Sequence, residues 1–227
     1  MTDRARDQAV GDQRLGDWRP TTTQERLDRM ESYAAIQQLA SRYARSLDAR
    51  DMAAVVALFD PDVQVGVDGR GRPALQAWMS TLMSQMRTSV HLVANHVIDF
   101  DDANHASGVV YCRDELERPE HGEWAVGTIQ YWDDYARLDG DWCFTPRRLH
   151  RWYLVDALTR PAAGAGVNDF GAHIRERLLP EAYPTWRKFW DTRSDAPGAP
   201  PEVDDDVKLA YVRCFDGSTR AGVRPVA

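Results

Sequence analysis

The sequence predicts an α+β fold in which helices cover one face of a curved, mostly antiparallel sheet. Helical periodicity is confined to the first part of the central region, and the second part contains only strand-like segments. A strong hairpin signal, Asp139-Gly140, joins the last two of these segments. Because helices and strands are segregated along the chain, we expect an α+β domain with a concave interior.

Three helices are expected. The first has an apolar stripe that repeats at steps of three and four residues: Ile36, Leu39, Tyr43 and Leu47. Asp51 has the character of an N-cap for a short second helix over 52–59, which Pro61 ends. The third begins at Pro73, and its apolar residues repeat at the spacing of one helix face: Leu75, Trp78, Met79, Leu82, Met83 and Met86.

Alternating valines at 63–67 predict a short strand between the second and third helices. Four further strands are expected after the third helix, over 90–100, 106–117, 124–135 and 142–155. Their short connections predict an antiparallel meander.

The chain divides into three parts by composition. Residues 1–24 are charged and poor in large apolar residues, which predicts a mobile N-terminal arm. Residues 25–160 carry the periodicity of the domain. Residues 161–227 begin with a Pro- and Gly-containing linker, and their apolar positions between 170 and 190 predict a helical segment. We expect this C-terminal extension to pack on the domain or on a neighbouring subunit.

Composition excludes several classes of protein. The net charge of −7 and the pI of about 5.4 argue against binding to nucleic acid or to an anionic membrane. No apolar run approaches the roughly 20 residues of a membrane span, and the polar N-terminus has no signal-peptide core. The 3 cysteines are too far apart for a zinc motif. We therefore expect a cytoplasmic protein without a bound metal.

The most informative residues are Tyr43 and Asp48 late in the first helix and His91 and Asn95 on a later strand. A carboxylate, an imidazole and a phenol can together move a proton from carbon to a leaving group. The helix dipole and an apolar pocket would raise the pKa of Asp48 toward neutrality. A solvated helix end is the alternative interpretation. His91 and Asn95 are four residues apart, so they should share one face of their strand.

The segment AAIQQLASRYARSLDARDMAAVVALFDPDVQV, followed by VHLVAN, resembles the SnoaL-like branch of the NTF2-like superfamily. The resemblance covers residues 25–156 and is greatest to bile-acid 7α-dehydratases, hexachlorocyclohexane dehydrochlorinases and scytalone dehydratases. It implies a cone of helices and curved sheet around a pocket, and a homodimer or homotrimer. It also implies that Asp48 abstracts the proton, that His91 is its partner, and that Tyr43 and Asp114 belong to the same site.

Other candidates for substrate binding are the basic residues of PRRLHRWY and one aromatic residue. The resemblance implies an arginine on the last strand, Arg147 or Arg148, and Arg151 lies close by. One of them could stabilise an oxyanion, whereas surface ion pairs are the alternative for the others. His150 and Trp78 complete the set, since an excess of aromatic residues suits a flat, hydrophobic molecule.

The resulting hypothesis is a lyase without cofactor, a dehydratase of a hydrophobic, hydroxylated polycyclic, polyketide, terpenoid or steroid-like molecule. No phosphate loop, nucleotide motif or metal triad is seen in the sequence. An isomerase or cyclase with the same base is the first alternative. A non-catalytic module that binds a hydrophobic ligand is the second.

Overall fold

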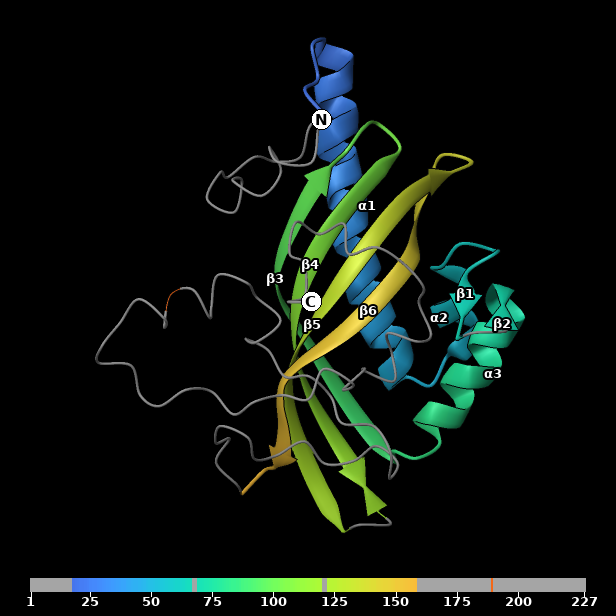
Figure 1. The fold of residues 1–227 in the computed structure, drawn as a ribbon, viewed down its shortest axis with the longest axis vertical. Coiled ribbons are helices and arrows are strands. Elements are labelled where there is room, and N and C mark those ends of the chain that lie inside the picture. Colours follow the sequence, from blue (N-terminus) through green and yellow to red (C-terminus); the bar gives the residue numbers. More distant parts are fainter. Residues whose placement is uncertain (1–17, 67–68, 120–121, 159–188, 190–227) are drawn as a thin grey trace.

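The computed structural model describes residues 18–66, 69–119, 122–158 and 189. Within these ranges the elements follow one another as α1 (Thr23–Asp48), α2 (Met52–Ala57), β1 (Gln64–Val65), β2 (Gly69–Arg70), α3 (Gly71–Met83), β3 (Thr88–Phe100), β4 (His105–Arg118), β5 (Glu123–Leu138) and β6 (Asp141–Asp156). The long α1 runs behind the curved sheet of β3 to β6, and α2, α3, β1 and β2 lie together beside it (Figure 1).

Helix α1 begins with a capping box. The Thr22 hydroxyl accepts from the backbone of Glu25, and the Glu25 side chain accepts from the backbone of Thr22. The apolar stripe of α1 is buried, and the helix ends at Asp48, where Ala49 is the C-cap. Upstream of the cap, the Trp18 backbone donates to Phe100, and its ring packs on the Phe100 ring. The region assigned to the N-terminal arm therefore contains the helix cap and this contact.

The sheet is an antiparallel meander in the order β3-β4-β5-β6. Three register shifts bend it: one on β3 between Val93 and His96, and two in the pairing of β5 with β6. Helix α1 contacts β3 and β6 on the concave side, where the main apolar core forms. The α+β class and the antiparallel sheet predicted from the sequence are thus confirmed.

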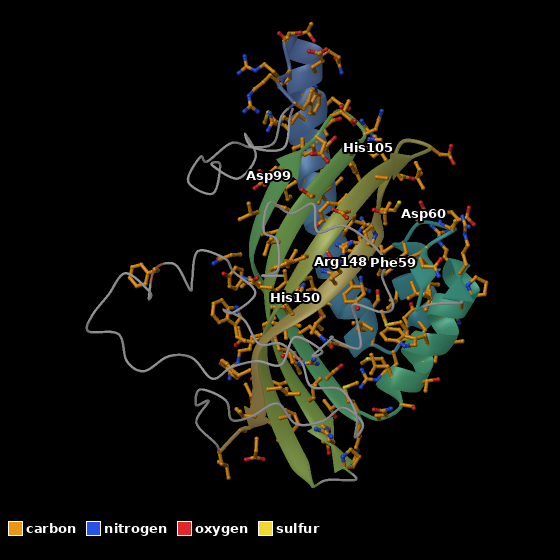
Figure 2. The ribbon with its side chains drawn as sticks, viewed as in Figure 1. Phe59, Asp60, Asp99, His105, Arg148 and His150 are labelled. Atoms are coloured by element: carbon orange, nitrogen blue, oxygen red, sulfur yellow. The ribbon has the colours of Figure 1, made fainter. Side chains whose placement is uncertain are left out.

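The loop after α2 joins the smaller helices to the sheet. Phe59 forms a parallel bridge with Phe144 of β6, and the Asp60 N–H donates to the Phe144 carbonyl at 2.7 Å. Figure 2 shows Phe59 and Asp60 beside β6. The Arg72 side chain, at the start of α3, donates to the Phe59 carbonyl. These bonds hold α3 so that its apolar face can close one side of the cone.

One strand is shorter than the sequence predicts. The valine strand expected over 63–67 is only the two-residue β1, paired with β2. The C-terminal helical extension expected over 161–227 lies outside the described residues, apart from Phe189. In the described part of the chain, no helix combines the length and the apolar character that crossing a membrane requires.

Candidate active site

The last residue of α1, Asp48, is hydrogen-bonded to the first part of β3. One oxygen, Oδ1, lies 2.7 Å from His91 Nδ1 and accepts from the Ser89 hydroxyl at 2.8 Å. The other, Oδ2, accepts from the His91 backbone N–H at 2.9 Å. Ser89 and His91 are two residues apart, so both side chains face α1. The carboxylate and the imidazole therefore form one oriented pair.

These hydrogen bonds decide the protonation state of Asp48. Burial alone would raise the pKa of this carboxyl, but the bonds from the ring and backbone of His91, the charge of His91 and the Ser89 hydroxyl outweigh it, so the pKa lies below its usual value. The expectation that the pKa of Asp48 is raised toward neutrality is wrong. Sequence reasoning included the helix dipole, burial and a histidine that opposes them, and it missed the Ser89 hydroxyl and the His91 backbone N–H.

The ionised Asp48 also sets the tautomer of His91. A carboxylate only accepts hydrogen bonds, so the contact at 2.7 Å places a proton on Nδ1 of His91. The other nitrogen, Nε2, then carries a lone pair, and His91 lines a cavity. In this geometry the imidazole can accept a proton at Nε2 while Asp48 orients the ring, whereas the resemblance implies that Asp48 itself abstracts the proton.

The cavity lies between α1, α3 and the concave face of the sheet. Its lining residues are Tyr43, Leu47, Met79, Leu82, Met83, Met86, His91, Asp114, Leu116, Tyr131, Leu149 and Arg151. The volume is about 30 Å³, room for about two water molecules. One wall, from α3, is formed by methionine and leucine, and the polar groups come from α1 and the sheet.

Asp114 reaches the cavity because of a glycine on the next strand. His91, Asp114, Gly127 and Leu154 are successive partners across the four strands. The Asp114 carboxylate, only 3% exposed, lies over Gly127, where a Cβ atom would overlap its Oδ1. Gly127 therefore provides the space that the Asp114 side chain occupies.

Tyr43 is fully inside the core, with its ring against aromatic residues of the sheet. The ring centres of Tyr43 and Tyr131 are 5.8 Å apart, and those of Tyr43 and Phe144 are 6.0 Å apart. Burial raises the pKa of Tyr43 to about 12, although Arg147 opposes this. The phenol is therefore a hydrogen-bond donor at the cavity and not a base.

Of the three arginines on β6, the structure places Arg151 at the cavity, and not Arg147 or Arg148. Arg147 is on the same face but deeper: its guanidinium lies 3.8 Å from the centre of the Tyr131 ring and makes a buried ion pair with Asp133 at 3.0 Å. Arg147 supports the floor of the cavity through the Tyr131 ring, which lines the cavity. Strand alternation could not distinguish Arg147 from Arg151, because they are four residues apart.

Arg148 and His150 alternate with the cavity-facing residues, so they lie on the other face of β6. Figure 2 shows both along this strand. Arg148 Nη1 and Asp134 Oδ2 are 3.7 Å apart, and the His150 ring packs tilted against Trp132 with ring centres 3.9 Å apart. Burial, helped by the charge of Arg148, lowers the pKa of His150 to about 3. Both residues were expected to bind substrate, and the structure does not bring them to the cavity.

The expectation that His91 and Asn95 share one face is also wrong. The register shift between Val93 and His96 inserts an extra residue on β3, and Asn95 is exposed. Beyond the bulge the other set of residues faces inward: Ile98 is buried, and His96 Nε2 lies 3.0 Å from the Tyr135 hydroxyl. A bulge exchanges the two faces of a strand.

The remaining candidate, Trp78 of α3, is half-buried against the core and does not line the cavity. Sequence reasoning did not select Ser89 or Tyr131. Ser89 could have been found from its position two residues before His91, and Tyr131 from the alternation of β5. Among the described residues, no three His, Cys, Asp or Glu side chains are grouped as metal ligands.

Comparison with known proteins supports this description of the fold. The family described as "SnoaL-like domain" matches residues 28–148. No curated protein matches the sequence. Similar solved structures include a candidate scytalone dehydratase from Novosphingobium aromaticivorans, with 23% identity and a TM-score of 0.51, over 65% of this chain and 100% of that one.

Two hexachlorocyclohexane dehydrochlorinase structures are also similar. LinA-type3 from Novosphingobium barchaimii LL02 has 24% identity and a TM-score of 0.52, over 63% of this chain and 98% of its own. Another LinA structure has 22% identity and a TM-score of 0.54, over 64% and 99%. At these identities the likeness shows a shared fold.

Proposed function

Because the chain belongs to the SnoaL-like domain family, we propose that it is a cofactor-independent lyase that removes water from a hydrophobic, hydroxylated small molecule. The observation that supports this most is the 2.7 Å contact of Asp48 with His91 Nδ1, on an imidazole that lines a cavity. Dehydration and dehydrochlorination, the activities named for the structural relatives, are both eliminations. The proposed substrates are polycyclic, polyketide, terpenoid or steroid-like alcohols.

In the proposed reaction, His91 Nε2 takes a proton from the carbon next to the one that carries the hydroxyl. The electron pair of that C–H bond forms the double bond, and the C–O bond breaks. The proton held by His91 leaves with the hydroxyl as water, so the imidazole returns to its starting state. The Asp48 carboxylate stabilises the imidazolium in between, a role that general acid–base pairs use.

The other polar residues of the cavity have supporting roles in this proposal. Tyr43 donates a hydrogen bond to the departing oxygen, because its phenol stays protonated. Arg151 faces an oxygen that gains negative charge, and Asp114 holds a substrate hydroxyl. These roles use the positions of the side chains around the cavity and need no added group.

The substrate must enlarge the cavity. The cavity has room for about two water molecules and is too small for a polycyclic alcohol. The wall most able to move comes from α3 and the connection after it, where Met79, Met83 and Met86 line the space. Methionine has three rotatable bonds and adapts its shape at low cost. We propose that these side chains turn aside when the substrate enters.

Turnover of a panel of hydroxylated steroids, polyketides and terpenoids, followed by mass spectrometry, tests the proposal. The expected product has lost one water, and His91→Gln should abolish its formation. The matched control is His105→Gln, since His105 contacts Asp102 in an exposed pair at the β3–β4 turn (Figure 2) and does not line the cavity. A product of unchanged mass would favour an isomerase or cyclase. Ligand binding without turnover would favour a binding module.

A further inference from the structure

Arg50 connects three segments that build the cavity. Its guanidinium nitrogen Nη1 donates to the Leu47 carbonyl at 2.8 Å and to the Ser89 hydroxyl at 2.7 Å. The other nitrogen, Nη2, donates to the Met86 carbonyl at 2.8 Å. These acceptors belong to the end of α1, the connection after α3 and the start of β3. One side chain thus joins the three elements at the point where the Asp48 carboxylate lies.

The backbone of Arg50 is unusual for its residue type. Its φ is +60°, in the left-handed region that favours glycine and asparagine. A glycine would make the same turn after α1 without strain, but it could not make the three bonds. The use of arginine here indicates that the side chain, and not the turn alone, is required.

The bond to Ser89 extends to the proposed catalytic pair. Ser89 is 5% exposed, and its hydroxyl accepts from Arg50 and donates to Asp48 Oδ1 at 2.8 Å. Because Arg50 fixes the oxygen of Ser89, it also fixes the direction of the Ser89 O–H bond. The same Asp48 oxygen accepts a hydrogen bond from His91 Nδ1, so this chain of hydrogen bonds from Arg50 ends at the imidazole.

We propose that Arg50 and Ser89 are positioning residues that hold the Asp48 carboxylate in the orientation that keeps His91 in its Nδ1–H form. This inference rests on the proposed function, in which His91 Nε2 is the base. Leu47 and Met86 also line the cavity, so the same guanidinium sets the position of the polar pair relative to the apolar wall. The alternative is that Arg50 only caps the end of α1.

NMR on the whole protein separates these two roles without a substrate. The first variant is Ser89→Ala, which removes one donor from Asp48 and leaves both carbonyl bonds of Arg50. The pKa of Asp48, measured by titration of its ¹³C carboxyl signal, should rise relative to the native protein, because a donor to the charged form is lost. An unchanged pKa would overturn the role of Ser89.

The second variant is Arg50→Gln, with Arg45→Gln as the matched control. Arg45 is exposed and lies in the last turn of the same helix, so the control removes the same charge. In Arg50→Gln the Nδ1 proton of His91 should exchange with water about tenfold faster, the change expected for one weakened hydrogen bond, and in the control it should not. Arg50→Lys, which keeps one charged donor, should restore part of the protection.

Each result decides between the two roles. Lower thermal stability in Arg50→Gln, with unchanged protection of the His91 proton, would show a cap alone and overturn the proposal. If Arg50→Gln does not fold, Arg50→Lys and Ser89→Ala decide it by the same two signals. Absence of turnover on every substrate would defeat the proposed function without altering these signals, so the two failures are distinguishable.

Discussion

Replacement of Asp48 by asparagine tests the central pair with almost no change of shape. In the native protein, the two oxygens of Asp48 receive three donors: the Ser89 hydroxyl, the His91 backbone and His91 Nδ1. An asparagine has one oxygen and one NH₂ group. If its oxygen takes the place of Oδ1, its NH₂ group meets the His91 N–H. We therefore expect a loss of stability of about 1–3 kcal/mol, the cost of one buried donor without an acceptor.

The loss of stability should depend on pH, and the sign follows from the pKa of Asp48. The folded pKa is below the unfolded one, so the carboxylate stabilises the fold above the unfolded value, near 4, and this stabilisation is lost as the pH falls through the folded pKa. Urea denaturation of Asp48→Asn and of the native protein at pH 7 and at pH 3 measures it. The two curves should be far apart at pH 7 and closer at pH 3.

The same variant should lose activity. Without the carboxylate, the imidazolium formed on proton abstraction loses its counter-charge, and kcat should fall by about 10²–10⁴-fold on the substrate that the panel identifies. The control is Asp102→Asn, in the exposed pair with His105, which should keep its activity and lose less stability than Asp48→Asn. Full activity of Asp48→Asn, or a stability difference that is equal at both pH values, would refute the reasoning.

Four other changes test separate parts of the structure. Gly127→Ala places a Cβ on the Asp114 carboxylate, so differential scanning calorimetry should show a loss of stability of about 1–3 kcal/mol, and kcat should fall. Unchanged stability and kcat would contradict the contact of Asp114 with Gly127. Tyr43→Phe should lower kcat by about tenfold to a hundredfold and leave the melting temperature nearly unchanged; an equal rate would remove the phenol from the mechanism. His150 is neutral in the folded protein and titrates near 6.5 when unfolded, so the free energy of unfolding should fall as the pH drops from about 6.5 toward 3. In urea denaturation, His150→Gln should make the free energy of unfolding less dependent on pH over this range. We propose that the protein is a homodimer or homotrimer that assembles through the outer face of β3, where Leu92 is 53% exposed. Leu92→Glu should then give a monomer by light scattering. An unchanged mass would exclude this face.

The sequence by itself determined the fold class and half of the site. Helical spacing placed Tyr43 on the buried stripe of α1 and Asp48 at its end, because both properties depend on a local period of 3.6 residues. The Asp-Gly turn and the alternating strands predicted the meander in the same way. The pairing of Asp48 with His91 came from a family resemblance and is present in the structure.

Tertiary structure decided what depends on neighbouring strands. A bulge on β3 turned Asn95 outward, and no property of a single strand indicates where its partner omits a residue. Arg151 was selected over Arg147 by the depth of each along the cone, which strand alternation does not encode. The low pKa of Asp48 comes from donors on β3, 41 and 43 positions along the chain. Local sequence determines which groups a segment presents, and their protonation and contacts depend on residues distant in sequence that only the packed structure brings to them.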